Sequence, residues 1–324
     1  MQTPWKLFGL LYCVLVSNFA EIAYAQTYPN RPVRIVVAYP PGGPTDLIAR
    51  LVAQRLSESL RQQFVIDNRG GANGIIGTEI VTRSQPDGHT LLFGTSSIAS
   101  NGSLYPKLPY DAAKDLSRIT LTANTPYFLV VNAAVSVNSA KELIALAQAK
   151  PAQINFGSAG NGAGTHLAGE MFNIHAGVKL VHVPYKGTGP AVTDLVAGRV
   201  QVMFVGLPAV NQHVKAGRLR LLAVAEPKRS PLMPELPTVA EAGLPDYQSS
   251  AWFGFFGPAG IKPELRRRIA TEITKVTQTK DLQDRMIALG AVPLSNTPEQ
   301  FDVYFREEVA RYMKIIKEAG VTLD

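Results

Sequence analysis

The chain has 324 residues and a formal net charge of +7, and 46% of its residues are hydrophobic. A chain of this length can bury a large core and usually divides into two domains. Lysine and arginine are dispersed, and the arginine run at 266–268 is typical of a solvated helix face rather than a nucleic-acid patch. A diffuse positive field favours a small anionic ligand, and we expect no nucleic-acid partner.

Residues 1–25 have the pattern of a secretory signal peptide. Lys6 precedes an apolar run from Leu7 to Ala20, and a small-residue cleavage pattern ends at Ala25. The run is about 14 residues, short of the roughly 20 that a membrane-spanning helix needs, so an N-terminal membrane anchor is the weaker alternative. We therefore expect export to a bacterial periplasm with cleavage after Ala25. The single cysteine, Cys13, would leave with the signal, and the mature chain would have no disulfide.

The chain after this segment alternates strands with glycine-rich turns and helices. Apolar residues between Leu47 and Leu56 recur at helical spacing, directly after a continuous apolar strand pattern. Such alternation indicates an α/β fold with mainly parallel sheets. The first set comprises strands over 33–39, 64–67 and 89–94, and helices over 46–60 and near residue 78.

A long extended segment, 120–132, leads into a second α/β set. We expect the segment from residue 249 to pair back onto it, which gives two lobes joined by two crossing strands. Ligands favour the cleft between such lobes and the carboxyl ends of parallel strands. The expected lobes are 26–125 with 226–324, and 126–225. The other expected elements are strands over 154–157, 180–185 and 200–206, and helices over 139–149, from 166, from 190, over 263–279 and over 298–318.

Two glycine-rich turns follow strands and precede helices, at Tyr39–Asp46 and Gly157–His166. Free N–H groups and the positive dipole at a helix start form an anion site, and glycine lets a ligand approach the backbone. Hydroxyl groups at the strand ends can also donate to a carboxylate. Either turn alone could be only a tight connection, but two turns facing one cleft favour a binding site. The hydroxyl candidates are Thr95, Ser96, Ser97, Ser158 and Thr165.

Motifs for nucleotide binding, hydrolysis and metal binding are missing from the sequence. The turn "GNGAGT" lacks the G-x-G-x-x-G spacing, and Ser158 lies in "FGSAG" rather than in a nucleophile elbow. The five histidines have no metal-ligand spacing; we expect His175 and His182 to be exposed or capped, and no acidic partner of His166 is evident. The sequence therefore predicts a binding protein with no cofactor and no metal, rather than an enzyme.

Six segments in one order resemble a known family. They are "YPPGGPTDLIAR", "NRGGANGIIGTEIV", "PDGHTLLFG", "GSAGNGAGTHLAGEMF", "HVPYKGTGPAVTDLVAGRV" and "PTVAEAGLP…WFGFFGPAG". They resemble the Bug-type extracytoplasmic solute receptors of tripartite tricarboxylate transporters. The resemblance implies a type II periplasmic-binding-protein fold that closes on a small carboxylate-bearing solute. It also implies delivery of the solute to membrane permease subunits, and we expect the receptor to be a monomer.

The resemblance further implies which residues hold the ligand. Asp46 is expected to order its turn rather than touch an anion. Many family members carry an aspartate where this chain has Val205 and Gly206, so the ligand could be a dicarboxylate, an aromatic acid or an amino acid. We expect acids with an uncharged tail or a second carboxylate to bind better than amino acids, because an unpaired buried ammonium costs several kcal/mol. The implied residues are Tyr39, Gly42, Gly43, Asp46, Thr95 and Ser96 from the first lobe, and Ser158, Gly160, Gly164, Thr165 and His166 from the second.

Two alternatives remain open at this point. A receptor of the same fold could serve as a sensor that passes its closed state to a membrane kinase. An enzyme working in the cleft would need a convergent acid and base, for which the candidates are His166, Asp46 and Lys186.

Overall fold

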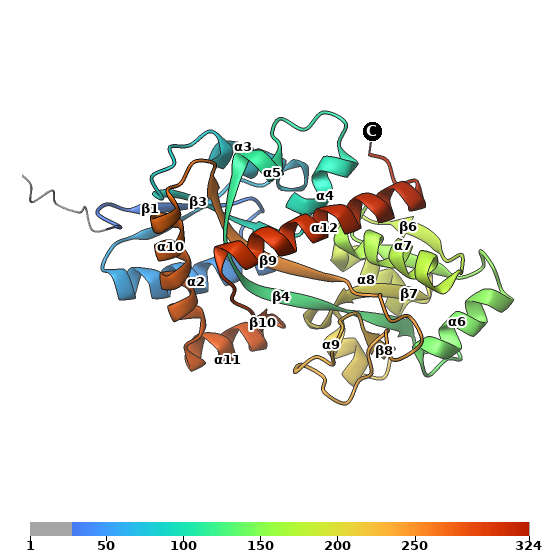
Figure 1. Cartoon of the computed structure of the whole chain (residues 1–324). Helices are drawn as coiled ribbons and strands as arrows, with labels where there is room; N and C mark the ends of the chain where they lie inside the picture. Colours follow the sequence, from blue (N-terminus) through green and yellow to red (C-terminus); the bar gives the residue numbers. More distant parts are fainter. Residues whose placement is uncertain (1–27, 324) are drawn as a thin grey trace, which may run out of the picture.

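The computed structural model describes residues 28–323, so the expected signal peptide lies outside the described residues. Two α/β lobes are joined through one long strand, β4 (Leu116–Asn132) (Figure 1). The strand order is β2-β1-β3-β9-β4-β7-β5-β6, and β8 and β10 also pair with β4. The two-lobed α/β architecture predicted from the sequence is therefore present.

The first lobe is a sheet covered by helices on both faces. On one face, apolar residues of α2 such as Ile48, Val52 and Leu56 pack with α10 against β1. On the other face, α3, α4 and α12 cover the same strands. The strands are β1 (Val33–Val37), β2 (Phe64–Asn68), β3 (Thr90–Thr95), β9 (Ser250–Pro258) and β10 (Val292–Pro293), and the helices are α2 (Pro44–Leu60), η1 (Ala72–Gly74), α3 (Ile75–Thr82), α4 (Ser97–Leu104), α5 (Ala112–Asp115), α10 (Pro263–Thr277) and α11 (Lys280–Ala288).

The second lobe repeats this arrangement with different helices. Phe156, Phe172 and Phe204 lie in a core between the sheet and helices α6 and α7, and Met203 and Val205 face α8 and α9 on the other side. Strands β5, β6 and β7 run parallel, as the alternating pattern predicts. The strands are β5 (Asn155–Ser158), β6 (Val181–Pro184), β7 (Val202–Gly206) and β8 (Leu219–Val224), and the helices are α6 (Ala140–Ala149), α7 (Gly164–Ala176), α8 (Thr188–Val196) and α9 (Leu207–Lys215).

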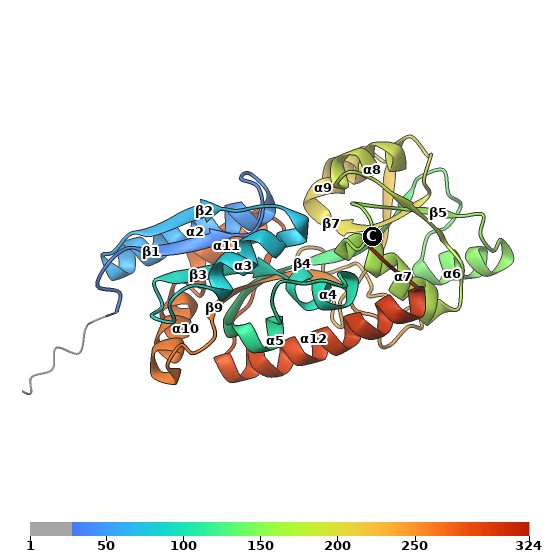
Figure 2. The same ribbon diagram turned by 90° about the horizontal axis from the view of Figure 1, so that it is seen from above.

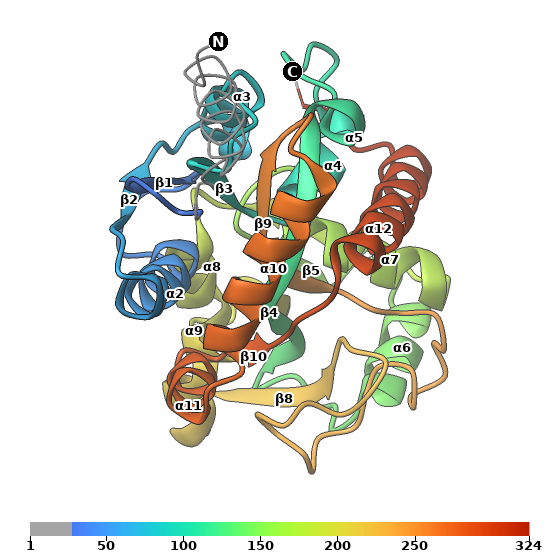
Figure 3. The ribbon, with the colours of Figure 1, turned by 60° about the vertical axis from the view of Figure 1, so that its left-hand side comes forward.

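The lobes meet where β4 changes its pairing partners. Its first part pairs antiparallel with β9 as far as Pro126 (Figure 3). Its second part pairs with β7 from Tyr127 onward and with β8 from Phe128 onward. The predicted return of the 249–260 segment onto the long strand is thus confirmed. The proline-rich connection between β8 and β9 packs on the second lobe, because Val239, Leu244 and Tyr247 lie in its core. This packing places the return crossing near Ser249 rather than at the expected residue 226.

Helix α12 (Pro298–Ala319) lies along both lobes (Figures 1 and 2). Its first half contributes Phe301 and Phe305 to the first lobe's core, and Ile315 near its end lies in the core of the second. The residues from 298 onward therefore do not belong to the first lobe alone. No helix within residues 28–323 is long and apolar enough to span a membrane.

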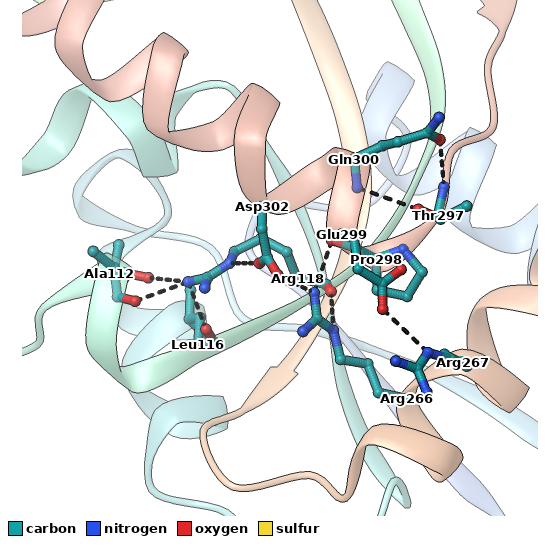
Figure 4. A network of polar contacts seen from close by, with 11 residues as sticks. Ala112, Leu116, Arg118, Arg266, Arg267, Thr297, Pro298, Glu299, Gln300 and Asp302 are labelled. Carbon is teal, nitrogen blue, oxygen red and sulfur yellow. Dashed lines mark hydrogen bonds and ion pairs between the residues drawn. The ribbon is translucent and has the colours of Figure 1, made fainter.

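Paired arginines fix the start of α12 on the first lobe (Figure 4). Nε of Arg118 donates to Asp302 over 2.7 Å, and Arg266 donates to the same carboxylate over 2.6 Å. Burial alone would raise the pKa of Asp302, but the bonds from Arg266 and Arg118 hold it below its usual value. At the first turn, Thr297 and Gln300 form a reciprocal capping box. This end of the helix is therefore rigidly held, while its other end contacts α7.

Candidate ligand-binding site

A cavity of about 540 Å³ lies between the lobes at the carboxyl ends of their parallel strands. Figure 2 shows α2 and α3 on one side of the molecule and α7, α8 and α9 on the other. Of the predicted site residues, Tyr39, Thr95 and Ser96 line the cavity from the first lobe. Gly164, Thr165, Val205 and Gly206 line it from the second lobe. Both lobes thus contribute to one site.

Among residues 28–323, none of those that line the cavity has a charged side chain. Instead, the first turns of helices α2, α4, α7, α8 and α9 lie at its wall. The lining residues in these turns include, in the same order, Thr45, Ser97, Gly164, Thr188 and Ala209. The first N–H groups of a helix have no partner within the helix, and its dipole is positive at this end. Five such ends around one cavity create an environment that attracts an anion without any arginine or lysine.

Three hydroxyl groups form a compact cluster on the first-lobe side. Oη of Tyr39 lies 3.1 Å from Oγ1 of Thr95 and 2.7 Å from Oγ of Ser97, and the last two atoms are 3.0 Å apart. Burial raises the pKa of Tyr39, although the bonds to Ser97 and Thr95 oppose this, so the phenol keeps its proton. Each hydroxyl carries one proton, so a carboxylate placed here could accept up to three hydrogen bonds.

The Pro-Pro-Gly-Gly turn owes its shape to Asp46. This carboxylate accepts hydrogen bonds of 2.9 Å from the N–H of Gly42, from Arg50 and from Asn68, and its residue is only 2% exposed. Burial alone would raise the pKa of Asp46, but these three donors lower it below its usual value. Asp46, Gly42 and Gly43 do not line the cavity. Asp46 therefore orders the turn, and the two glycines contribute by placing the start of α2.

The second turn is held from behind by its own hydroxyl groups. Oγ1 of Thr165 accepts a hydrogen bond from the N–H of Ala159, and Oγ of Ser158 accepts one from the N–H of Gly160. Gly160 has a φ of +136°, a conformation that glycine adopts readily. Ser158 and Gly160 do not line the cavity, although the sequence suggested direct contact. Ser158 is completely buried, so its hydroxyl is directed into the lobe.

Two stacked imidazoles lie behind this turn. The rings of His166 and His182 are 3.6 Å apart at an angle of 10°, and Nε2 of His182 lies 2.6 Å from Oγ of Ser158. Burial, followed by the neighbouring His166, lowers the pKa of His182 to about 4. The expectation that His182 is exposed or capped is therefore wrong, because the parallel pairing of β6 with β5 places its ring over the buried face of α7. His166 does have an acidic neighbour, Glu170, and it does not line the cavity.

Another part of the wall is apolar. Val205 and Gly206 lie beside side chains that sequence reasoning did not single out, from β9, the start of α9 and the end of α11. These apolar residues are Pro208, Ala209, Ala251, Phe253 and Leu289. Residues 28–323 contain no cluster of three or more groups suited to hold a metal ion. The cavity thus combines a hydrogen-bonding side with an apolar side.

This fold, with a cavity between two lobes, is the fold of a family of solute-binding receptors. Residues 48–321 match the model of the tripartite tricarboxylate transporter family receptor, and the chain belongs to that family. BugT of Bordetella pertussis is 36% identical over 96% of both chains. Rpa4515 of R. palustris, solved with adipate, is 36% identical with a TM-score of 0.79, over 91% of this chain and 100% of that one. MatC of Rhodopseudomonas palustris, solved with malate, is 29% identical with a TM-score of 0.74, over 89% and 100%.

Proposed function

We propose that this receptor captures a small carboxylate-bearing metabolite in the inter-lobe cavity and delivers it to the permease subunits of a tripartite transporter. The observation that carries the proposal is the convergence of five helix N-termini and three hydroxyl groups on a cavity with no charged side chain. A carboxylate gains charge-assisted hydrogen bonds from such donors, whereas a cation finds no partner there. The relatives solved with adipate and malate support the same ligand class.

In this proposal each lobe supplies hydrogen-bond donors to the ligand carboxylate. Tyr39, Thr95, Ser96 and Ser97 donate to one carboxylate from the first lobe, and the N–H groups at the start of α7, at Gly164 and Thr165, donate from the second lobe. Because the donors lie on both lobes, closure of the lobes completes the site. Gly42, Gly43 and Asp46 hold the first turn, and Ser158, Gly160 and His166 hold the second.

The apolar wall determines which groups the ligand can carry beyond its first carboxylate. Val205, Pro208, Ala209, Phe253 and Leu289 suit a hydrocarbon chain or a ring. A second carboxylate could reach another helix start, because α8 and α9 also begin at the cavity. An ammonium group would be desolvated without a carboxylate beside it. We therefore propose dicarboxylates and acids with uncharged tails as ligands, ahead of amino acids.

The cellular setting follows from the family. We propose that the chain is exported to the periplasm, is cleaved after Ala25 and works as a monomer. A monomer is consistent with a site that is built from the two lobes of one chain.

Native mass spectrometry of the freshly purified protein tests this function, followed by calorimetry with adipate, malate and benzoate. We expect one acid per chain and micromolar affinity for at least one acid of the panel. A receptor that binds none of these acids, or that co-purifies with a cationic ligand, would contradict the proposal.

A Tyr39→Phe variant locates the site. It removes one hydroxyl from the cluster while the ring keeps its packing, so binding should weaken. Tyr105→Phe is the matched control, because Tyr105 follows α4 in the same lobe but does not line the cavity. Equal affinities of the two variants would place the carboxylate elsewhere.

A further inference from the structure

The stacked pair His166 and His182 is not part of the cavity wall, yet it contacts the turn that forms one side of it. The backbone N–H of Gly162, a residue that lines the cavity, donates to Nδ1 of His166 over 3.0 Å. His182 reaches the other half of the same turn through Ser158. Each imidazole therefore holds one part of the turn from which α7 begins.

The hydrogen bond from Gly162 fixes the protonation state of His166. A backbone N–H can only donate, so Nδ1 must carry a lone pair, and the ring proton lies on Nε2. Nε2 in turn lies 3.5 Å from Oε1 of Glu170, one turn further along α7. A second proton on Nδ1 would place two donors face to face. The hydrogen bond to Gly162 would then be lost.

The stack packs both imidazoles on an apolar surface. The ring of Phe156 lies against both of them, with centroids 6.2 Å from His166 and 5.0 Å from His182. The charged and titratable groups that face the pair are the two rings themselves and Glu170. Burial and the neighbouring His166 lower the pKa of His182, so the folded pair favours the neutral ring at this position.

We propose that His166 and His182 are positioning residues for ligand capture: they hold the Ser158–Gly164 turn so that the start of α7 faces the ligand. This inference rests on the proposed function, because it assumes that the start of α7 contacts the ligand carboxylate. It goes beyond that function by making ligand affinity depend on two residues that do not line the cavity.

Two substitutions separate the hydrogen bond from the packing. The amide oxygen of asparagine occupies a position close to Nδ1 of histidine and accepts a hydrogen bond, whereas leucine fills a similar space and accepts none. His166→Asn should therefore bind nearly as tightly as the unaltered receptor, and His166→Leu should bind more weakly. His175→Asn is the matched control, because His175 lies on the same helix but is exposed and far from the turn.

Calorimetry at pH 8 provides the test, with adipate as the probe, or malate or benzoate where that acid binds more tightly. We expect His166→Leu to bind roughly tenfold more weakly than the unaltered receptor, as the loss of one hydrogen bond would produce. We expect His166→Asn and His175→Asn to bind within about threefold of the unaltered receptor.

Histidine ¹⁵N spectra keep the test decisive if His166→Leu does not fold. Spectra of the labelled receptor should show the Nε2–H tautomer of His166, which leaves Nδ1 able to accept from the N–H of Gly162. The Nδ1–H tautomer, or equal affinities of His166→Leu and the unaltered receptor, would overturn the inference alone. Absence of binding by the unaltered receptor would overturn the proposed function and the inference with it.

Discussion

Removal of the hydroxyl group of Tyr39, in a Tyr39→Phe variant, is the most specific single change that can be made to the site. This hydroxyl group contacts Thr95 and Ser97, which also contact each other at 3.0 Å. Tyr39→Phe leaves this second contact in place and creates no unpaired buried charge. Folding should therefore lose about 1 kcal/mol or less.

Binding should lose more than folding does. A hydrogen bond to a charged group contributes about 1.5–3 kcal/mol, and 1.4 kcal/mol is tenfold in affinity, so Tyr39→Phe should weaken binding by about 10- to 150-fold. Isothermal calorimetry with the tightest-binding acid of the panel measures this effect, and urea unfolding measures the stability. Unchanged affinity with unchanged stability would show that the hydroxyl cluster does not touch the carboxylate.

Three further predictions concern the crossing between the lobes, the ligand class and closure. Burial raises the pKa of Glu226, beside Asn124 and Ser250 at the lobe crossing, to about 7. The folded state then binds more protons than the unfolded state between about pH 4.5 and 7, so stability falls as pH rises through this window. Glu226→Gln should remove this slope and raise the free energy of unfolding at pH 8 by about 1–3 kcal/mol, as measured by urea titrations. The control Glu241→Gln, at an exposed site, should neither remove the slope nor stabilise the protein. In calorimetry, succinate should bind more than about tenfold more tightly than aspartate, because no carboxylate among the described lining residues can pair with the ammonium group of aspartate. Tighter binding of aspartate would show that backbone carbonyl groups reach its ammonium group. The radius of gyration in small-angle scattering should decrease when ligand saturates the receptor; an unchanged radius would contradict closure of the lobes.

Most strands and the two glycine turns could be predicted from sequence because their signals are local. Most of these strands are short apolar runs, and each turn places glycine beside a helix start. Strand β10, with only two residues, was not predicted. Helix α4 was not predicted, because its sequence "SIASNGSL" is rich in serine, asparagine and glycine, which are poor helix formers. Its stability comes from packing of Ile98 and Leu104 with α12, far away in sequence. A serine pair before Ile98 was the one local signal for its start.

Site details that depend on distant partners could not be predicted. Gly164 is required because a Cβ there would lie 2.5 Å from Oη of Tyr127, whereas a Cβ on Gly43 would meet open space. The stacking of His182 on His166 follows from the order of strands in the second sheet. The return crossing near Ser249 follows from apolar residues within a segment whose prolines suggested only a connection.

A crystal structure of the receptor with adipate, or with whichever acid of the panel binds most tightly, tests the central claim most directly. We predict one carboxylate within hydrogen-bonding distance of the hydroxyl groups of Tyr39 and Ser97 and of the backbone N–H groups at the start of α7, with no arginine or lysine beside it. A carboxylate paired with a charged side chain, or a ligand bound outside this cavity, would contradict the account.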